Sequence, residues 1–194
     1  MAYKLTILIP TVPSRLDKIK ELIHELNYQI QTKPVQYLYL GDNKSMSVGE
    51  KRNLLKHMAK GEFICYIDDD DEISKDYIEV ILKAINENPD KTVICFNGTQ
   101  TTDGHQDLPF CYNVNNGRNF KTEINGKRFK VMIPDHLCVW NKSKILEDFP
   151  HKNLAEDHDW AQAMSFHYHE SDQVILNDYL YHYKYDRKLT ECRP

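Results

Sequence analysis

Short apolar runs alternate with segments of helical spacing in the first half of the chain, and this alternation constrains the fold more than any other feature. The apolar runs lie at residues 4–9, 35–40, 63–67 and 92–96. Between them, apolar side chains recur at the spacing of an amphipathic helix in residues 16–30, 48–59 and 75–86. Strands joined by such helices predict right-handed crossovers and a mainly parallel sheet with helices on both faces.

The pattern changes after residue 97. Residues 98–108 are polar and loop-like, and two Asn-Gly pairs then predict an antiparallel meander from about residue 108 to 133. Further elements are expected in order: a loop leading into a strand at 133–140, a short helix near 143–146, a helix ending near 169, and strands at 174–176 and 179–185. Since no linker or repeat is evident, we expect one domain, residues 1–194, with halves 1–97 and 98–194.

Four aspartates and a glutamate, residues 68–72, follow the third apolar run directly. Because side chains alternate along a strand, Asp68 and Asp70 are expected on one face and Asp69 and Asp71 on the other. Carboxylates this close raise one another's pKa unless a cation or hydrogen-bond donors hold them ionised. A simpler alternative is a solvated turn that begins the next helix, but capping uses only one or two acidic groups. We therefore favour a site for Mg²⁺ or Mn²⁺, ions that commonly bridge a phosphate.

Polar residues also follow the first two apolar runs. Ligands of parallel α/β sheets bind beyond the carboxyl ends of the strands, which meet at one edge. The sequence therefore predicts that Pro10, Thr11, Asp42 and the acidic run lie along the same edge.

Composition narrows the class of function. The formal net charge of −4 gives no general attraction for nucleic acid or an anionic membrane. The longest early apolar run, Leu5–Ile9, is too short for a signal peptide or a membrane span, so a cytoplasmic protein is expected. The five cysteines form no CxxC pair and are interpreted as reduced structural thiols.

Four motifs follow one another along the chain: Ile9-Pro10-Thr11, the segment 49–53 (GEKRN), the acidic run, and Glu156-Asp157 before Trp160. Together they resemble the GT-A fold glycosyltransferases of the family 2 type, which use nucleotide-diphospho-sugar donors. The resemblance implies a single α/β domain with a Rossmann-like sheet and a small antiparallel insertion. It also implies transfer of a sugar to an acceptor hydroxyl with inversion, and a Mn²⁺ or Mg²⁺ cofactor.

The resemblance implies a role for each matching residue. Asp70, with Asp68, would hold the metal that bridges the donor diphosphate. The expected nucleotide-sugar-binding residues are Pro10, Thr11, Asp42, Arg52, Asp68 and Asp69. Asp157 matches the general base that deprotonates the acceptor hydroxyl. Taken alone, Asp157 would be interpreted as a helix cap, and the paired acidic motifs favour the base.

Weaker candidates come from the second half of the chain. His182 could be a third metal ligand or an ordinary strand histidine. His136 and Trp140 could shape the acceptor pocket, although Trp140 could equally be a core residue. Arg187 and Lys188 could close over the diphosphate or belong to a solvated tail.

The partners expected are a UDP- or GDP-linked sugar and an acceptor hydroxyl on a glycan, a lipid-linked sugar, a protein or a modified nucleobase. No membrane span and no sequence-specific nucleic-acid binding are expected, and the short acceptor region favours a compact enzyme over a processive polymer synthase. One alternative, a sugar nucleotidyltransferase, would need a glycine-rich phosphate loop, and residues 10–16 contain no glycine. The other alternative, a noncatalytic nucleotide- or carbohydrate-binding module, would not need a base.

Overall fold

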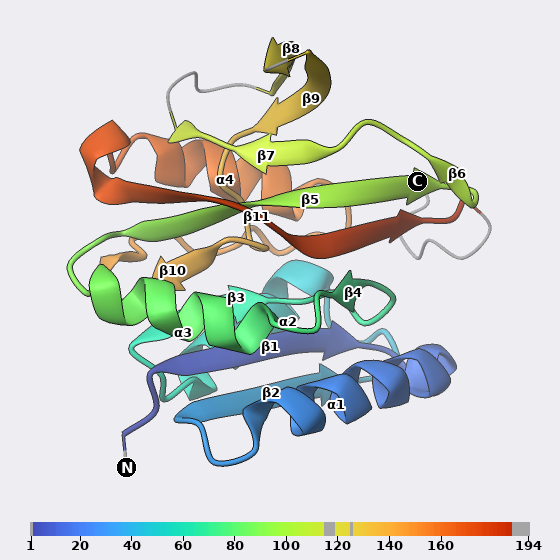
Figure 1. The fold of residues 1–194 in the computed structure, drawn as a ribbon. Coiled ribbons are helices and arrows are strands. Elements are labelled where there is room, and N and C mark those ends of the chain that lie inside the picture. Colours follow the sequence, from blue (N-terminus) through green and yellow to red (C-terminus); the bar gives the residue numbers. More distant parts are fainter. Residues whose placement is uncertain (1, 115–118, 125, 188–194) are drawn as a thin grey trace.

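One continuous sheet organises the computed structural model, which describes residues 2–114, 119–124 and 126–187 (Figure 1). The strands of the described residues are β1 (Leu5–Thr11), β2 (Val35–Gly41), β3 (Phe63–Tyr66), β4 (Glu72–Ile73), β5 (Val93–Thr102), β6 (His105–Gln106), β7 (Phe110–Tyr112), β8 (Phe120–Ile124), β9 (Lys127–Met132), β10 (Val139–Asn141) and β11 (Gln173–Tyr185). The α-helices are α1 (Leu16–Ile30), α2 (Val48–Met58), α3 (Tyr77–Glu87) and α4 (Glu156–Ser165), and the 3-10 helices are η1 (Pro13–Arg15), η3 (Lys142–Lys144) and η4 (Glu170–Asp172).

The sheet is mixed but mainly parallel around the strands that carry the site. Its order is β2-β1-β3-β10-β5-β7-β9-β8, and β11 pairs with β5 and β4. Strand β1 is parallel to β2 and β3, and β5 is parallel to β11. Strand β10 is antiparallel to both of its neighbours, β3 and β5. The predicted fold class, an α/β sheet with a small antiparallel part, is therefore confirmed.

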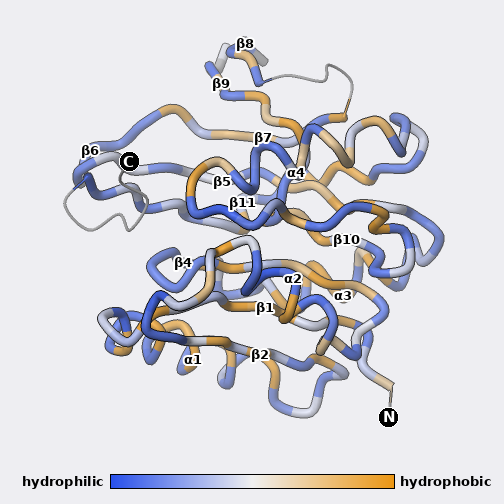
Figure 2. Tube along the Cα trace, turned by 180° about the vertical axis from the view of Figure 1, so that it is seen from behind, coloured by the Kyte–Doolittle hydropathy of each residue, from blue (hydrophilic) through white to orange (hydrophobic). Residues whose placement is uncertain are grey.

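Helices cover both faces of the sheet, as predicted. Helices α1 and α3 lie on one face, and α2 and α4 lie on the other (Figures 1 and 2). Every residue of β1 is buried, and this strand is drawn mainly in the hydrophobic colour in Figure 2. Helix α1 buries Ile19, Leu22 and Leu26 at the predicted helical spacing. The core thus fixes the strand ends from which the polar residues project.

Several predicted boundaries are wrong, and long-range pairing explains most of the errors. Residues 98–102 continue β5, because β11 pairs with all of them and β6 pairs with Thr101 and Thr102. The two strands predicted at 174–176 and 179–185 are one strand with register shifts. The helix predicted near 143–146 is the 3-10 turn η3, and α4 ends at Ser165.

The predicted meander is only partly antiparallel. Strands β8 and β9 are antiparallel, whereas β7 and β9 are parallel. Residues 115–118, which include the first Asn-Gly pair, and Asn125 of the second pair lie outside the described residues. Within the described ranges, no helix has the length and apolar content needed to cross a membrane.

Candidate active site

A pocket of about 320 Å³ opens at the carboxyl edge of the sheet. Its walls come from six segments: the end of β1, η1, the start of α2, the turn after β3, the start of α4 and the end of β11. The pocket therefore brings together residues that sequence motifs had singled out: Pro10, Thr11, Arg52, Asp68, Asp69, Asp70 and Asp157. Asp42 is not among the lining residues.

The acidic run forms a turn, so the predicted alternation of its side chains is wrong. Strand β3 ends at Tyr66, and the Asp71 backbone N–H donates to the Asp68 carbonyl at 3.2 Å, which closes the turn. As a result, the neighbouring Asp69 and Asp70 face the same cation. Arg15 Nη1 lies 2.7 Å from Asp69 Oδ1 and 3.2 Å from Asp70 Oδ2.

Asp69 and Asp70 differ in burial and in their neutral partners. Asp69 is buried and accepts a hydrogen bond from Thr11 Oγ1 at 2.6 Å. Burial raises the pKa of Asp69, and the Thr11 hydroxyl and Arg15 oppose the rise. Burial also raises the pKa of Asp70, where the Asp68 and Asp69 carboxylates add to the effect.

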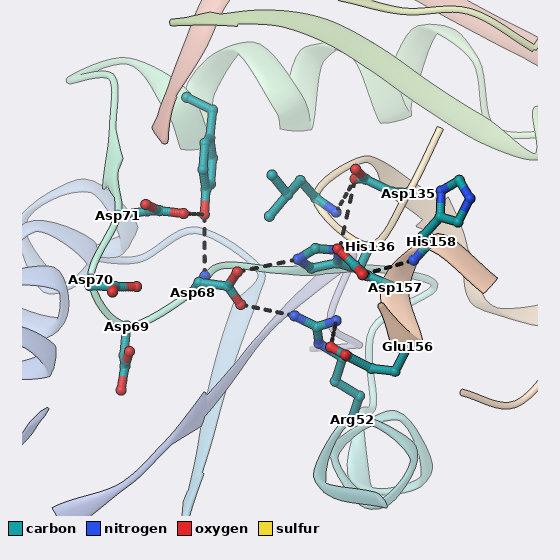
Figure 3. A network of polar contacts seen from close by, with 12 residues as sticks. Arg52, Asp68, Asp69, Asp70, Asp71, Asp135, His136, Glu156, Asp157 and His158 are labelled. Atoms are coloured by element: carbon teal, nitrogen blue, oxygen red, sulfur yellow. Dashed lines mark hydrogen bonds and ion pairs between the residues drawn. The ribbon is translucent and has the colours of Figure 1, made fainter. Parts of the chain in front are cut away.

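Asp68 is held by two buried basic side chains (Figure 3). Arg52 Nη2 donates to Asp68 Oδ1 at 3.1 Å, and His136 Nε2 lies 3.4 Å from Asp68 Oδ2. Burial alone would raise the pKa of Asp68, but Arg52 and then His136 outweigh it and hold the pKa well below its usual range. Asp68 is therefore ionised at neutral pH.

Asp71 anchors the turn to β11 with neutral donors. The Tyr181 hydroxyl donates to Asp71 Oδ2, and the Lys184 backbone N–H donates to Asp71 Oδ1, each at 2.7 Å. Burial and the nearby Asp68 charge raise the pKa of Asp71 well above its ordinary value. The Tyr181 hydroxyl also accepts from the Asp68 backbone N–H at 3.2 Å. The alternating tyrosines of 179–185 were visible in the sequence, but their strand partner was not.

Arg52 connects the acidic turn to α4. Its Nη1 donates to Glu156 Oε1 at 2.7 Å, and its guanidinium lies 5.8 Å from the centre of the Tyr66 ring. Burial lowers the pKa of Arg52, and the Asp68 and Glu156 carboxylates raise it by more. A Ser47–Glu50 capping box fixes the start of α2, one turn before Arg52.

Lys51 lies between the pocket and Asp42. Its Nζ lies 2.5 Å from Asp42 Oδ1 and donates to the Thr11 carbonyl at 3.0 Å. This lysine ammonium is the first cause of the lowered pKa of Asp42, which also accepts from the Met46 backbone N–H at 2.8 Å. Asp42 therefore supports Lys51 from behind. In the sequence, Lys51 belongs to the motif at residues 49–53, but no role was predicted for it.

Asp157 lies in the first turn of α4 and lines the pocket. Its Oδ1 accepts from the His158 backbone N–H at 2.8 Å, and its Oδ2 lies 3.8 Å from His136 Nδ1. The side chain is 39% exposed, so an acceptor can reach it. Ala155, which precedes α4, has a left-handed backbone (φ 56°, ψ 26°) and turns the chain into the helix at the pocket wall.

The other second-half candidates lie apart from the pocket. Trp140 is enclosed in the core, where it packs against Trp160 and presents no face to a ligand. The His182 ring contacts Thr99 Oγ1 at 2.7 Å, so the structure does not bring it together with Asp68 and Asp70. Arg187 Nε pairs with Asp103 Oδ2 at 3.2 Å. Lys188 lies outside the described residues.

The residues present fit a divalent cation that also takes ligands from substrate. Asp68 and Asp70 offer hard carboxylate oxygens in one pocket, and a cation beside Asp70 would offset the burial and the neighbouring carboxylates that raise its pKa. In the described ranges, no group of three or more His, Cys, Asp or Glu side chains is arranged to hold a metal. Mg²⁺ commonly binds through one or two carboxylates together with waters and substrate phosphates, which matches this donor set.

Comparisons with solved structures identify the same architecture in a bacterial protein. The crystal structure of S. aureus TarS 1-349 has a TM-score of 0.65 and 18% sequence identity, and the match covers 93% of this chain and 60% of that chain. Its complex with UDP-GlcNAc gives a TM-score of 0.65 at 16% identity, covering 93% of this chain and 58% of that one. The complex with UDP gives 0.66 at 18%, covering 93% and 60%. This chain therefore spans about three fifths of those TarS chains, and the likeness shows a shared fold.

A family comparison adds a sequence-level match over most of the chain. A search of curated proteins found no match. The family model described as "Glycosyl transferase family 2", in contrast, matches residues 13–149, which include η1, α2 and the acidic turn. On the strength of this match, the chain belongs to glycosyl transferase family 2.

Proposed function

We propose that this protein is a metal-dependent, inverting glycosyltransferase that moves a sugar from a nucleotide-diphospho-sugar to an acceptor hydroxyl. One observation carries the proposal: Asp68 to Asp70 of the acidic turn and Asp157, which come from opposite halves of the chain, line the same pocket. A noncatalytic binding module would need the first group only. Family membership supports the reaction class.

The donor side of the pocket suits a nucleoside diphosphate. Arg15, Lys51, Arg52 and Lys184 place positive charge around a wall that also carries Thr11. The complexes of TarS with UDP-GlcNAc and UDP support a UDP-linked donor. A cation held by Asp68 and Asp70 would neutralise charge on the departing diphosphate, as Lewis-acid catalysis requires.

Asp157 is the proposed general base. One oxygen is held by the His158 backbone N–H, and the other lies 3.8 Å from His136 Nδ1. A carboxylate placed there accepts the proton of an acceptor hydroxyl as that oxygen bonds to the anomeric carbon and the bond to the diphosphate breaks. A single displacement from the opposite face inverts the anomeric configuration.

Replacing the base separates turnover from binding. We expect Asp157→Asn to lower transfer or donor hydrolysis by about 10²- to 10⁴-fold while UDP affinity is unchanged. Asp159→Asn is the matched control, because Asp159 lies in the same first turn of α4 but pairs with Lys152 outside the pocket. Turnover that survives in Asp157→Asn would exclude the base assignment.

Ligand-dependent melting tests the donor and the metal. Ligands that bind only the folded state raise its melting temperature by mass action. We expect UDP-sugars with Mn²⁺ or Mg²⁺ to raise the melting temperature more than either component alone, and Asp70→Asn to remove the contribution of the metal. A panel in which no nucleotide-sugar produces a shift would argue against the proposal. The cytoplasmic location and the single-domain organisation expected from the sequence remain predictions.

A further inference from the structure

His136 lies between the two groups of carboxylates that the proposed reaction uses (Figure 3). It is 4% exposed and belongs to the loop that leads into β10. Its Nε2 lies 3.4 Å from Asp68 Oδ2 in the acidic turn, and its Nδ1 lies 3.8 Å from Asp157 Oδ2 in α4. A single buried ring therefore borders both the metal-side carboxylate and the proposed base.

The two ring nitrogens have different surroundings. Nε2 faces Asp68 at hydrogen-bonding distance, whereas Nδ1 has no hydrogen-bond partner among the described residues. The carboxylates nearest to Nδ1 are Asp157 Oδ2 at 3.8 Å and Asp135 Oδ1 at 3.9 Å. A buried polar nitrogen without a partner raises the free energy of the folded state. A small movement of a carboxylate toward Nδ1 would therefore lower that free energy.

Asp157 has an oxygen available for this contact. Its Oδ1 is already bound by the His158 backbone N–H, so Oδ2 is the oxygen that faces His136. Two contacts, one to each oxygen, define the plane of a carboxylate, whereas one contact leaves it free to rotate. His136 is therefore placed to fix the orientation of Asp157.

The loop that carries His136 is itself held firmly. The His136 carbonyl accepts from the Tyr66 backbone N–H at 3.0 Å, at the end of β3. The Asp135 carbonyl accepts from Trp140 Nε1 at 2.7 Å, and Asp135 Oδ1 accepts from the Leu137 backbone N–H at 2.9 Å. These bonds tie the ring to the sheet and leave it little freedom to follow a moving carboxylate.

We propose that His136 is a positioning residue, whose Nδ1 holds the Asp157 carboxylate in the orientation that receives the acceptor proton while Nε2 keeps the ring in register with Asp68. This role rests on the proposed function, because orienting a base matters only if Asp157 acts as one. It differs from direct contact with an acceptor sugar, because the buried ring acts through Asp157.

Two amide substitutions separate the two ring nitrogens. The side-chain N–H group of Asn lies near the position of Nδ1, and that of Gln lies near the position of Nε2. We expect His136→Gln, which keeps the Asp68 contact, to lower kcat about 10- to 100-fold with an unchanged KM for the donor. His136→Asn, which keeps the Asp157 contact, should retain most of kcat. His167→Asn is the control, because His167 pairs with Glu147 away from the pocket.

A double-mutant cycle tests whether His136 acts through Asp157. If it does, His136→Gln should cause little further loss of turnover in the Asp157→Asn background, since residues that act as a unit are strongly non-additive. Equal fold-losses in both backgrounds would overturn the proposal, as would equal losses of kcat in the Gln and Asn variants.

Crystal structures of the variants test the orienting role of His136 without depending on whether sugar transfer is observed. We expect the Asp157 carboxylate to rotate in His136→Gln and to keep its orientation in His136→Asn. If the unaltered protein transfers no sugar, the proposed function fails, and this structural comparison still decides the inference. An Asp157 carboxylate that is unmoved in His136→Gln overturns it. Should the Gln variant not fold, a structure of His136→Phe, which keeps a ring of similar shape without either nitrogen, gives the answer: the Asp157 carboxylate should rotate, and an unmoved carboxylate overturns the inference.

Discussion

Carboxylates lie in two regions of the site, and the two regions differ in the side chains and backbone groups that balance their negative charge. The first region is the acidic turn, Asp68–Asp71. The second, here called the α4-side cluster, comprises Asp135, Glu156 and Asp157. In the turn, Asp69 and Asp70 have Arg15, and Asp71 has neutral donors. The α4-side cluster instead depends on two buried basic side chains that also serve the turn.

Sharing a cation makes the two regions electrostatically dependent. Arg52 contacts both Asp68 and Glu156, and His136 borders both Asp68 and Asp157. Arg15, in contrast, pairs with Asp69 and Asp70 of the turn. A substitution at Arg52 or His136 is therefore expected to affect both regions, and a substitution at Arg15 is expected to affect the turn.

The largest expected effect comes from removing a shared cation. Arg52→Met removes the buried cation that Asp68 and Glu156 share, so we expect it to lower the free energy of unfolding by about 3–5 kcal/mol. Arg15→Met is the comparison variant, because Asp69 keeps the Thr11 hydroxyl, and a loss of about 1–2 kcal/mol is expected. Urea denaturation measures both values. Equal losses would show that sharing has no energetic consequence.

The pH dependence of the free energy of unfolding should distinguish Asp135, in the α4-side cluster, from Asp68 in the acidic turn. Burial raises the pKa of Asp135 to about 6 in the folded state, from an ordinary value of 3.8. A raised folded pKa contributes stability that is full below 3.8 and is lost as pH rises through about 6. Between pH 4 and pH 7 the unaltered protein should therefore lose up to about 3 kcal/mol that Asp135→Asn does not lose.

Denaturation curves at several pH values measure this difference directly. The lowered pKa of Asp68 acts in the opposite direction, since its contribution is lost as pH falls below 3.8, and it is present in both proteins. Parallel pH profiles for the unaltered protein and Asp135→Asn would contradict the assignment to Asp135.

A smaller effect tests whether Trp140 belongs to the core rather than to the pocket. Trp140→Phe removes the hydrogen bond from Nε1 to the Asp135 carbonyl and part of a buried ring. We expect the free energy of unfolding to fall by about 2 kcal/mol while UDP affinity is unchanged. Isothermal titration with UDP and Mn²⁺ provides the binding value. A selective loss of acceptor turnover without a loss of stability would restore the acceptor role predicted from the sequence.

The smallest effect concerns the entry to α4. Ala155 adopts φ 56°, a region in which only glycine is free of strain. Ala155→Gly should therefore raise the free energy of unfolding by up to about 1 kcal/mol, and thermal melting would detect the gain. Ala161→Gly in the interior of α4 is the matched control, and it should have the opposite sign.

Local periodicity was sufficient to predict the donor half of the fold. Helices α1 and α2 and strands β1 to β3 each carry their own pattern of burial, so the sequence predicted them to within a few residues. Helix α1 begins without a side-chain cap, directly after η1. The polar end of β5 was missed because its strand conformation depends on β11, which lies far away in the sequence.

Residue type predicted which side chains line the pocket better than how they are arranged. Thr11, Arg52 and Asp157, which the motifs singled out, line the pocket, because their strand and helix ends follow from local patterns. The acidic run was expected to continue a strand, and its turn depends on bonds to Tyr181 and Lys184. No local signal could show this, since those partners lie on a strand more than a hundred positions later.

Strand β10 runs against both of its neighbours, β3 and β5, and this direction has a consequence for how the pocket is assembled. A strand that follows a helical crossover starts at the edge opposite the ligand and ends at the ligand edge. Strand β10 runs the other way: it starts at the ligand edge. Asp135 and His136 therefore reach the site from the segment before the start of a strand, whereas Thr11 and Asp68 reach it from the ends of strands. Because β10 lies between β3 and β5, the His136 loop is anchored to the middle of the sheet.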